Sequence, residues 1–438
     1  MAIVRSRRFV AILALAAIVG VVASLIAWGF LQLTFYTQEW VYTDLPRDLG
    51  YDSTPVWWSL PVLALAGLLV AFAIVRLPGT AGHLPAAGLN TGAIQPIELP
   101  GVILAALASI GLGAVVGPEA PLIAIGAGLG LLTVHLLRRD APDELGAVIA
   151  ASGMFAALAF LFGSPLIAAV ILIEAAGLGG RRLVPVLIPG LMAGGIGSLV
   201  WIGMGSWTGL DKSNISIDVL SLPQFGSPDL VDFLWTIPFA AVVALGTVVI
   251  FRLARRLVPV VSSRPFVLLP VAGVAISGLA IAFHATADES VNEVLFSGEY
   301  SIGPLVEDAE AWSLSALALL IAFKGLAYSI SLAGFRGGPV FPAMFLGATG
   351  GLMVAQLPGF ELTPAVAVGI GAAIAGVLRL PLTALLIATL LTSGSGLGTG
   401  PLVILGVTVA YLVALAIEGE EPSEEPEEGP SAVATASG

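Results

Sequence analysis

Long runs of uncharged, apolar residues follow one another along almost the whole of this chain of 438 residues. After a first run from Phe9 to Gln38, the others are 56–75, 99–118, 120–137, 145–173, 183–210, 233–251, 265–287, 337–360, 362–378 and 380–417. Only 11% of the residues are charged and the mean hydropathy is +1.02, whereas a soluble domain carries about 25% charged residues. Lipid must therefore solvate most of this surface, and we predict an all-α integral membrane protein.

Several of these runs are too short for a full crossing or are interrupted by glycine and proline. A helix that crosses a membrane needs about 20 apolar residues. The run 145–173 is interrupted at 163–165, and the run 380–417 is interrupted at 393–396 and again at 400–401. Non-helical backbone at membrane depth is tolerated only where protein or a water-filled cavity surrounds it. We therefore expect full, half and broken transmembrane helices around a buried polar route.

The two ends of the chain carry the strongest charge bias. Arg5, Arg7 and Arg8 precede the first run. That run is longer than the apolar core of a signal peptide, which has about 7–15 residues. A positive flank favours the cytoplasmic side. Residues 418–438 hold seven glutamates and no lysine or arginine, a composition typical of disorder. We predict a membrane domain over 1–417 in the cell membrane, with the N-terminus and a disordered acidic tail over 418–438 in the cytoplasm.

Several classes of function have no support in the sequence. There is no cysteine, so thiolate metal sites and cysteine nucleophiles are excluded. His83, His135 and His284 lie far apart without the spacing of metal ligands. No HExxH motif, paired aspartates in apolar segments or Gly-x-Ser-x-Gly turn is present. We expect no enzyme activity, no metal, no cofactor and no nucleic-acid partner.

Glycine and proline also reveal an internal repeat. GPEAP at 117–121 begins one short apolar segment, and GPVFP at 338–342 begins another. The number of residues between these two motifs also separates Gly126 from Gly347 and Gly130 from Gly351. A slightly smaller number of residues separates Pro165 from Pro381. We expect two homologous halves, about 9–210 and 233–417. Paired segments interrupted by glycine or proline indicate a transport site where the repeats meet.

The starts of these two segments suit a bound anion. Free N–H groups and the positive end of the helix dipole attract an anion without a fixed charge, and glycine lets the backbone approach it closely. Glu119 is the one charged residue between Leu99 and Leu137. A carboxylate at membrane depth is costly and usually functional. It either serves the transport site or only satisfies a helix start.

These stretches resemble signatures of the CLC chloride channel/transporter family. GPEAP at 117–121 is similar to the family's G-x-E-G-P, and GGPVFP at 337–342 is similar to G-x-F-x-P. AGHLP at 81–85 stands where the family has G-S-G-I-P. The segments 163–174 and 378–390 are also similar in pattern and order.

The resemblance covers roughly residues 60–415. It implies an inverted repeat of broken helices, usually a homodimer with one pore per subunit. It also implies a channel or exchanger for a small inorganic anion, chloride by default, with Glu119 as a gating glutamate whose carboxylate occupies an anion site and swings away. Backbone at helix starts would bind the anion, at Gly117, Pro118, Ala120, Gly82, His83, Leu84, Gly338, Val340 and Phe341.

Some positions depart from the family pattern. Gly82 replaces the family's serine and lacks its hydroxyl; the His83 that follows is more simply a membrane-edge histidine. Val340 replaces a phenylalanine. The family's inner tyrosine aligns near Ser395. Either Ser393 or Ser395 supplies a hydroxyl there, or the stretch is a plain loop.

The proton-coupling glutamate of some family members aligns best with Ala175. The preceding Glu174 either replaces it on a proton path or is a helix-end carboxylate. We therefore predict weak or absent proton antiport. Lys324, Arg336 and Arg379 are expected to reach the membrane edges or to pair there, and Arg336 would raise the positive potential beside the second signature.

One other transport function suits the same pattern. A secondary transporter for an organic solute also uses inverted repeats and broken helices. Such a transporter would usually present more intramembrane polar residues than a single glutamate and backbone. The sequence therefore favours a small inorganic anion over an organic solute.

Overall fold

The computed structural model describes residues 7–92, 94–137, 142–177, 180–206, 219–396 and 398–418. In these ranges the chain is helical apart from its loops. The single extended pairing among them is an antiparallel bridge between Gly117 and Gly338. The predicted all-α class is confirmed.

The helices fall into an N-terminal and a C-terminal set. The first set is α1 (Arg7–Glu39), α2 (Leu45–Asp48), α3 (Ser59–Arg76), α4 (Leu99–Gly111), α5 (Glu119–Leu137), α6 (Asp143–Leu161), α7 (Pro165–Ala175) and α8 (Gly180–Ser206). The second is α9 (Leu230–Ser263), α10 (Pro265–Ala287), α11 (Ile302–Glu307), α12 (Leu314–Gly334), α13 (Val340–Ala355), α14 (Leu362–Leu378), α15 (Pro381–Leu391) and α16 (Gly400–Glu418). Short turns of π- or 3₁₀-helix are η2 (Trp40–Asp44), η3 (Pro85–Ala87), η4 (Pro96–Glu98), η5 (Val291–Glu293), η6 (Ala309–Ala311) and η7 (Ser393–Ser395).

Helix length divides these elements into two classes. Nine helices of the described chain are long and apolar enough to cross a membrane. Shorter apolar helices of 10–17 residues accompany them, including α7, α13, α14 and α15. The expected mixture of full and shorter transmembrane helices is therefore confirmed.

The helices break where glycine and proline predict. After α6, Gly163 adopts a φ of +61°, which favours glycine. The Ser164 hydroxyl then accepts a hydrogen bond from the Ile167 N–H at 3.4 Å and caps α7. Proline at the first position of α7 costs nothing because its N–H would be unpaired there. In the C-terminal run, α15 ends before Gly396, at φ +97°, and α16 begins at Gly400.

The same helix crossing occurs twice. In α5 and α6, a Cβ added to Gly126 would lie less than 3.0 Å from the Gly153 carbonyl oxygen. In α13 and α14, a Cβ added to Gly347 would lie equally close to the Gly369 carbonyl oxygen. Gly126 and Gly347 are a pair of the sequence repeat, and Gly153 and Gly369 have the separation of Pro165 from Pro381. Small residues let both helix pairs approach closely.

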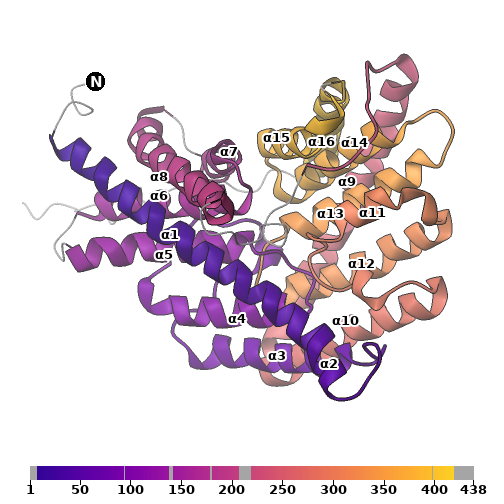
Figure 1. The fold of residues 1–438 in the computed structure, drawn as a ribbon, viewed down its shortest axis with the longest axis horizontal. Helices are drawn as coiled ribbons and strands as arrows, with labels where there is room; N and C mark the ends of the chain where they lie inside the picture. Colours follow the sequence, from indigo (N-terminus) through magenta and orange to yellow (C-terminus); the bar gives the residue numbers. More distant parts are fainter. Residues whose placement is uncertain are drawn as a thin grey trace, which may run out of the picture.

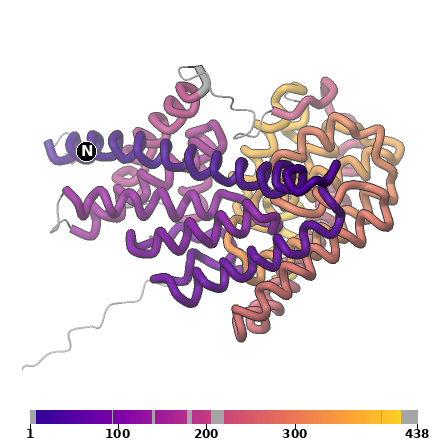
Figure 2. Tube along the Cα trace, turned by 60° about the horizontal axis from the view of Figure 1, so that its bottom comes forward, coloured from indigo at the N-terminus to yellow at the C-terminus, as the bar shows by residue number. Residues whose placement is uncertain are grey.

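The two sets lie side by side (Figure 1). α3 and α10 pack together between them, and the Ser59 and Ser277 hydroxyls are 2.5 Å apart there. α1 packs along α6 and α8, and its far end reaches the second set (Figure 2). At that end the Tyr42 ring packs edge-on against the Phe296 ring at 5.0 Å. The boundary of the two sets is therefore a broad apolar interface.

The predicted tail begins one residue too early. Glu418 is the last residue of α16 and pairs with arginines, which hold it in the helix. Residues 419–438 lie outside the described residues, as does the predicted end of the first half at residue 210. The limits of the two halves therefore stay a prediction.

Candidate functional site

The two glycine-proline signatures meet at the centre of the molecule. The Gly117 N–H donates to the Gly338 carbonyl oxygen at 2.8 Å, and the Gly338 N–H donates to the Gly117 carbonyl oxygen at 2.6 Å. α5 begins two residues after the first glycine, and α13 begins two residues after the second. We call this crossing, residues 117–119 and 338–340, the junction.

The Glu119 carboxyl group fills the junction. Its side chain is fully buried. Oε1 accepts a hydrogen bond from the Val340 N–H at 2.5 Å, while Oε2 has no partner in the part of the chain that the structure describes. A Cβ added to Gly338 or Gly117 would overlap this carboxyl group. The group therefore fits only because both flanking residues are glycines.

The start of α13 supplies the hydrogen bond that holds Glu119. The first N–H groups of a helix have no partner within the helix and lie at its positive end. The Tyr328 hydroxyl fixes this start by donating to the Pro339 carbonyl oxygen at 2.6 Å. The two predicted helix starts therefore face each other across the Glu119 carboxyl group. The carboxyl group occupies the space between them.

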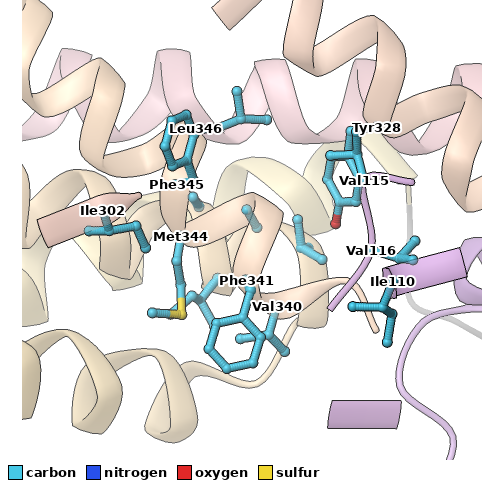
Figure 3. Close-up of a cluster of buried hydrophobic side chains, with 14 of the residues drawn as sticks. Ile110, Val115, Val116, Ile302, Tyr328, Val340, Phe341, Met344, Phe345 and Leu346 are labelled. Atoms are coloured by element: carbon cyan, nitrogen blue, oxygen red, sulfur yellow. The ribbon is translucent and has the colours of Figure 1, made fainter. Parts of the chain in front are cut away.

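An apolar shell surrounds the start of α13 (Figure 3). Val115, Val116 and Val340 are buried there. The buried ring of Phe341 stacks on that of Phe162, with centroids 5.8 Å apart. Electrostatic interactions are stronger where water is excluded. The shell therefore increases the effect of the few polar groups at the junction.

The 81–85 stretch differs from the prediction that a helix begins there. Ala81 and Gly82 adopt φ values of +57° and +93°, which an α-helix does not allow. The 3₁₀ turn η3 that follows has only three residues, and Gly88, at φ +88°, succeeds it. Gly82, His83 and Leu84 therefore offer loop backbone, without a helix dipole.

Gly82 and His83 do lie beside α5. They line a cavity of about 20 Å³ together with Ala120, Arg336 and Gly337, among others. Burial lowers the pKa of His83, the positive charge of Arg336 lowers it further, and Glu98 opposes both. Burial of His83 therefore favours its neutral imidazole beside this cavity.

Arg336 gives the small cavity a positive wall. Its side chain is largely buried. It donates to the Thr80 carbonyl oxygen from Nε at 3.3 Å and from Nη2 at 3.2 Å, and to the Gly334 carbonyl oxygen from Nη1 at 3.0 Å. Backbone carbonyls satisfy the guanidinium inside the protein, so it does not extend into water as expected. A guanidinium stays charged, so the expected positive potential is present.

Lys324 is buried as well, so its ammonium does not extend into water as expected. Its Nζ donates to the carbonyl oxygens of Glu293 at 2.8 Å and Leu295 at 3.0 Å. The ammonium also lies 4.3 Å from the centroid of the Phe345 ring, a favourable cation–π distance. Several carbonyl oxygens and a ring face thus replace water around Lys324.

Glu299 is the residue that the sequence analysis missed. It lies outside the membrane-spanning helices, in the loop before α11, with 6% of its surface exposed. Its Oε1 has no partner among the described residues. Burial raises the pKa of Glu299 to about 8, and the charge of Glu119 contributes to that increase.

A repeat separation offers a signal for Glu299. Gly82 and Gly298 are separated by the same number of residues as Pro165 and Pro381. Both glycines adopt a positive φ, +93° at Gly82 and +81° at Gly298. A titratable residue follows each glycine, His83 in one case and Glu299 in the other. Comparing the loops of the two repeats would therefore have pointed to Glu299.

The remaining predicted residues have partners elsewhere. The hydroxyls of Ser393 and Ser395 donate to the carbonyl oxygens of Leu390 at 2.8 Å and Leu222 at 3.1 Å, respectively. Backbone carbonyls therefore satisfy both hydroxyls, and an inner-gate role for either serine stays a prediction.

Glu174 lies at the end of α7 and reaches the start of α15. Its Oε1 accepts from the Leu382 N–H at 2.9 Å and its Oε2 from the Thr383 N–H at 2.8 Å. This is the geometry of a carboxylate that satisfies a helix start.

Known proteins are similar to this chain in sequence and in fold. A family model described as voltage gated chloride channel matches residues 84–415. The "Putative ion-transport protein YfeO" of Escherichia coli O1:K1 is 31% identical over 369 residues, covering 82% of each chain. The protein of that name from Escherichia fergusonii is 30% identical over 370 residues, also covering 82% of each chain.

Two solved structures have the same fold. A slow cyanobacterial Cl⁻/H⁺ antiporter superposes with a TM-score of 0.76 at 18% identity. A CLC-type fluoride/proton antiporter superposes with a TM-score of 0.68 at 16% identity. Each comparison covers 93% of this chain and 95% of the other.

Proposed function

This chain belongs to the voltage-gated chloride channel (CLC) family, and from that membership we propose that it moves small inorganic anions, chloride by default, through a route gated by Glu119. It is a multi-pass membrane protein of a family that transports anions. Its own cargo, its gate and its mode of transport are what we propose. The mode is a channel or a weakly proton-coupled exchanger.

One observation carries the proposal. The buried Glu119 carboxyl group accepts a hydrogen bond from the first N–H of α13 and leaves its second oxygen unpartnered in the described structure. A halide accepts hydrogen bonds from the same kind of donor, because helix starts bind anions generally. The carboxylate is therefore a tethered stand-in for the transported anion.

Displacement of this carboxylate would open the route. An anion that approaches the junction repels the ionised Glu119, and a proton would neutralise it. In either case the side chain leaves the Val340 N–H for the anion. The positive Arg336, in the wall of the neighbouring small cavity, attracts the incoming ion. Gly117 and Gly338 give it room to pass close to the backbone.

The size of the neighbouring cavity favours a small ion over an organic solute. The cavity beside α5 has a volume of about 20 Å³, and one water needs roughly 10–15 Å³ of such volume. An organic molecule would require a much larger rearrangement. The polar groups near the junction are also few, as expected for an ion that must leave quickly.

Two further parts of the proposal rest on family membership and charge. We expect a homodimer with one pore per subunit. The arginines before the first helix favour a cytoplasmic N-terminus, and the acidic C-terminal residues would lie on the same side.

A liposome flux assay tests this function. Proteoliposomes are loaded with chloride and, separately, with a neutral solute of similar size, and efflux is recorded with fluoride, bromide and nitrate as additional cargoes. We expect chloride efflux well above that of empty liposomes and no efflux of the neutral solute. Efflux of the neutral solute without chloride would show that the anion assignment is wrong.

A further inference from the structure

Three arginines converge on the carboxylate of Glu418. Arg255 Nη2 lies 2.5 Å from Glu418 Oε1, and Arg252 Nε lies 3.8 Å from the same oxygen. Arg379 Nη2 donates to Oε2. Only 9% of the Glu418 side chain is exposed, against 42–49% for Arg252 and Arg255. Three positive charges thus surround a single negative charge.

The chain positions these arginines from two separate elements. Arg252 and Arg255 are three residues apart in α9 and share one face of that helix. Arg379 follows α14 with a φ of +55°, and its N–H donates to the Ala375 carbonyl oxygen at 3.0 Å. α9, α14 and α16 pack against one another (Figure 1). The guanidiniums are therefore held in place by packed helices.

A cavity of about 650 Å³ lies beside this cluster. Arg255 and Arg379 line it, together with residues 86–89 of the loop that contains η3. Residues 82–83 of the same loop line the small cavity beside α5. One loop therefore connects the wall of the large cavity to the vicinity of the junction.

We propose that Arg255 and Arg379 form a second anion site at the mouth of this cavity, with the Glu418 carboxylate as its tethered occupant. The ligand is a small monovalent inorganic anion such as chloride or bromide. Guanidinium groups on two elements donate to both carboxylate oxygens, and such donors serve a free anion equally well. The site deepens the proposed function, because it would concentrate the cargo where the cavity opens.

A purely structural clasp is the competing interpretation. Arg252 also donates to the Ile417 carbonyl oxygen at 2.7 Å, so the cluster ties the end of α16 to α9. If the cluster is only a clasp, removing the Glu418 charge leaves no anion between the arginines. If the cluster is an anion site, a free anion binds between the arginines once that charge is removed.

Bromide is the probe that distinguishes an anion site from a structural clasp. Crystals of the full-length Glu418→Gln variant and of the wild type are grown in bromide, and anomalous density is measured between Arg255 and Arg379. We expect a bromide peak in Glu418→Gln and none in the wild type at the same concentration. Glu310→Gln removes the same charge at an exposed position outside this cluster, and is expected to behave as the wild type. No peak in Glu418→Gln overturns the site.

Two further measurements keep the proposal open to refutation. If Glu418→Gln does not fold, a bromide series on the wild type replaces it, because high bromide should displace the carboxylate and give the same peak. Adding Arg255→Gln should remove that peak, and a peak of unchanged height would overturn the site. Bromide bound here without chloride flux in any variant would support this site and refute the proposed transport function instead.

Discussion

At Gly338 the absence of a side chain leaves the space that the Glu119 carboxyl group occupies. Gly117 leaves space on the other side, and a Cβ on either residue would overlap the carboxyl group. Neither glycine has the positive φ that would itself require glycine. The reason for glycine at both positions is therefore room for the carboxyl group and, in our proposal, for the anion that replaces it.

A double-mutant cycle tests this argument. Gly338→Ala should lower stability by about 1–3 kcal/mol, the usual cost of overpacking. In a Glu119→Ala background the same change should cost less than about 1 kcal/mol, because the overlapping group is gone. Thermal unfolding of the four proteins measures both steps. An equal loss in both backgrounds would show that the Glu119 side chain does not fill this space.

Glu299 predicts a pH dependence of stability. Its pKa is raised from 4.5 to about 8, so the folded protein keeps the group protonated at pH values where the unfolded chain has released the proton. Stability from this group is complete below pH 4.5 and is lost as pH rises towards about 8, by up to about 1.4 kcal/mol per pH unit. Glu299→Gln should flatten that part of the profile.

The measurement is the unfolding temperature against pH for the wild type and Glu299→Gln. Glu310→Gln, at an exposed position, serves as the control and should keep the wild-type slope. If Glu299→Gln also keeps that slope, the carboxyl group is ionised or solvated in the folded protein, and its burial is not as described.

At the scale of helices, close glycine crossings hold the repeated elements together. α5 crosses α6 at Gly126 and Gly153, and α13 crosses α14 at Gly347 and Gly369. The first residues of α5 and α13 form the junction. Each crossing therefore fixes one helix start against the next helix of its own set, and the Gly117–Gly338 bridge joins the two starts.

Equivalent substitutions in the two crossings should have similar effects. Gly126→Ala and Gly347→Ala each place a methyl group against a carbonyl oxygen and should cost about 1–3 kcal/mol. Gly246→Ala in α9 is the matched control, because its methyl group meets nothing within 4 Å, and it should stabilise by about 0.5–1 kcal/mol. Melting temperatures of the three variants report this. If all three behaved alike, close packing would not be what fixes the crossings.

The sequence predicted elements better than individual contacts. Gly163 and Pro165 correctly predicted a helix break, because their backbone preferences act locally. The burial of Lys324 was not predicted, because its partners are carbonyl groups of a loop some 28 to 31 residues earlier in the chain, which composition does not reveal. His83 was expected beside a helix start, but the residues before it form a left-handed turn. Such contacts depend on tertiary packing.

At the scale of the whole molecule, two repeated sets of helices place one carboxylate at the junction where they cross. In our proposal this arrangement gives an anion its route, but it does not by itself couple the anion to protons. Ala175 cannot carry a proton, and both oxygens of Glu174 accept hydrogen bonds from the start of α15.

We therefore predict weak or absent proton antiport. Proteoliposomes with an outward chloride gradient should show little proton uptake against its gradient while chloride leaves. The control is chloride efflux in the same vesicles, which must be measurable. Robust uphill proton movement at a fixed stoichiometry would show that Glu174, or another proton path, couples the two ions.

The most direct test of the account is anion flux against pH for the wild type, Glu119→Gln and Glu119→Ala. Glu119→Gln keeps the size of the side chain but cannot act as an anion, and Glu119→Ala vacates the site. Both should transport chloride at least as fast as the wild type and with a weaker dependence on pH, at comparable protein yield. If both variants keep the wild-type flux and pH profile, Glu119 only satisfies a helix start, and the proposed gate is wrong.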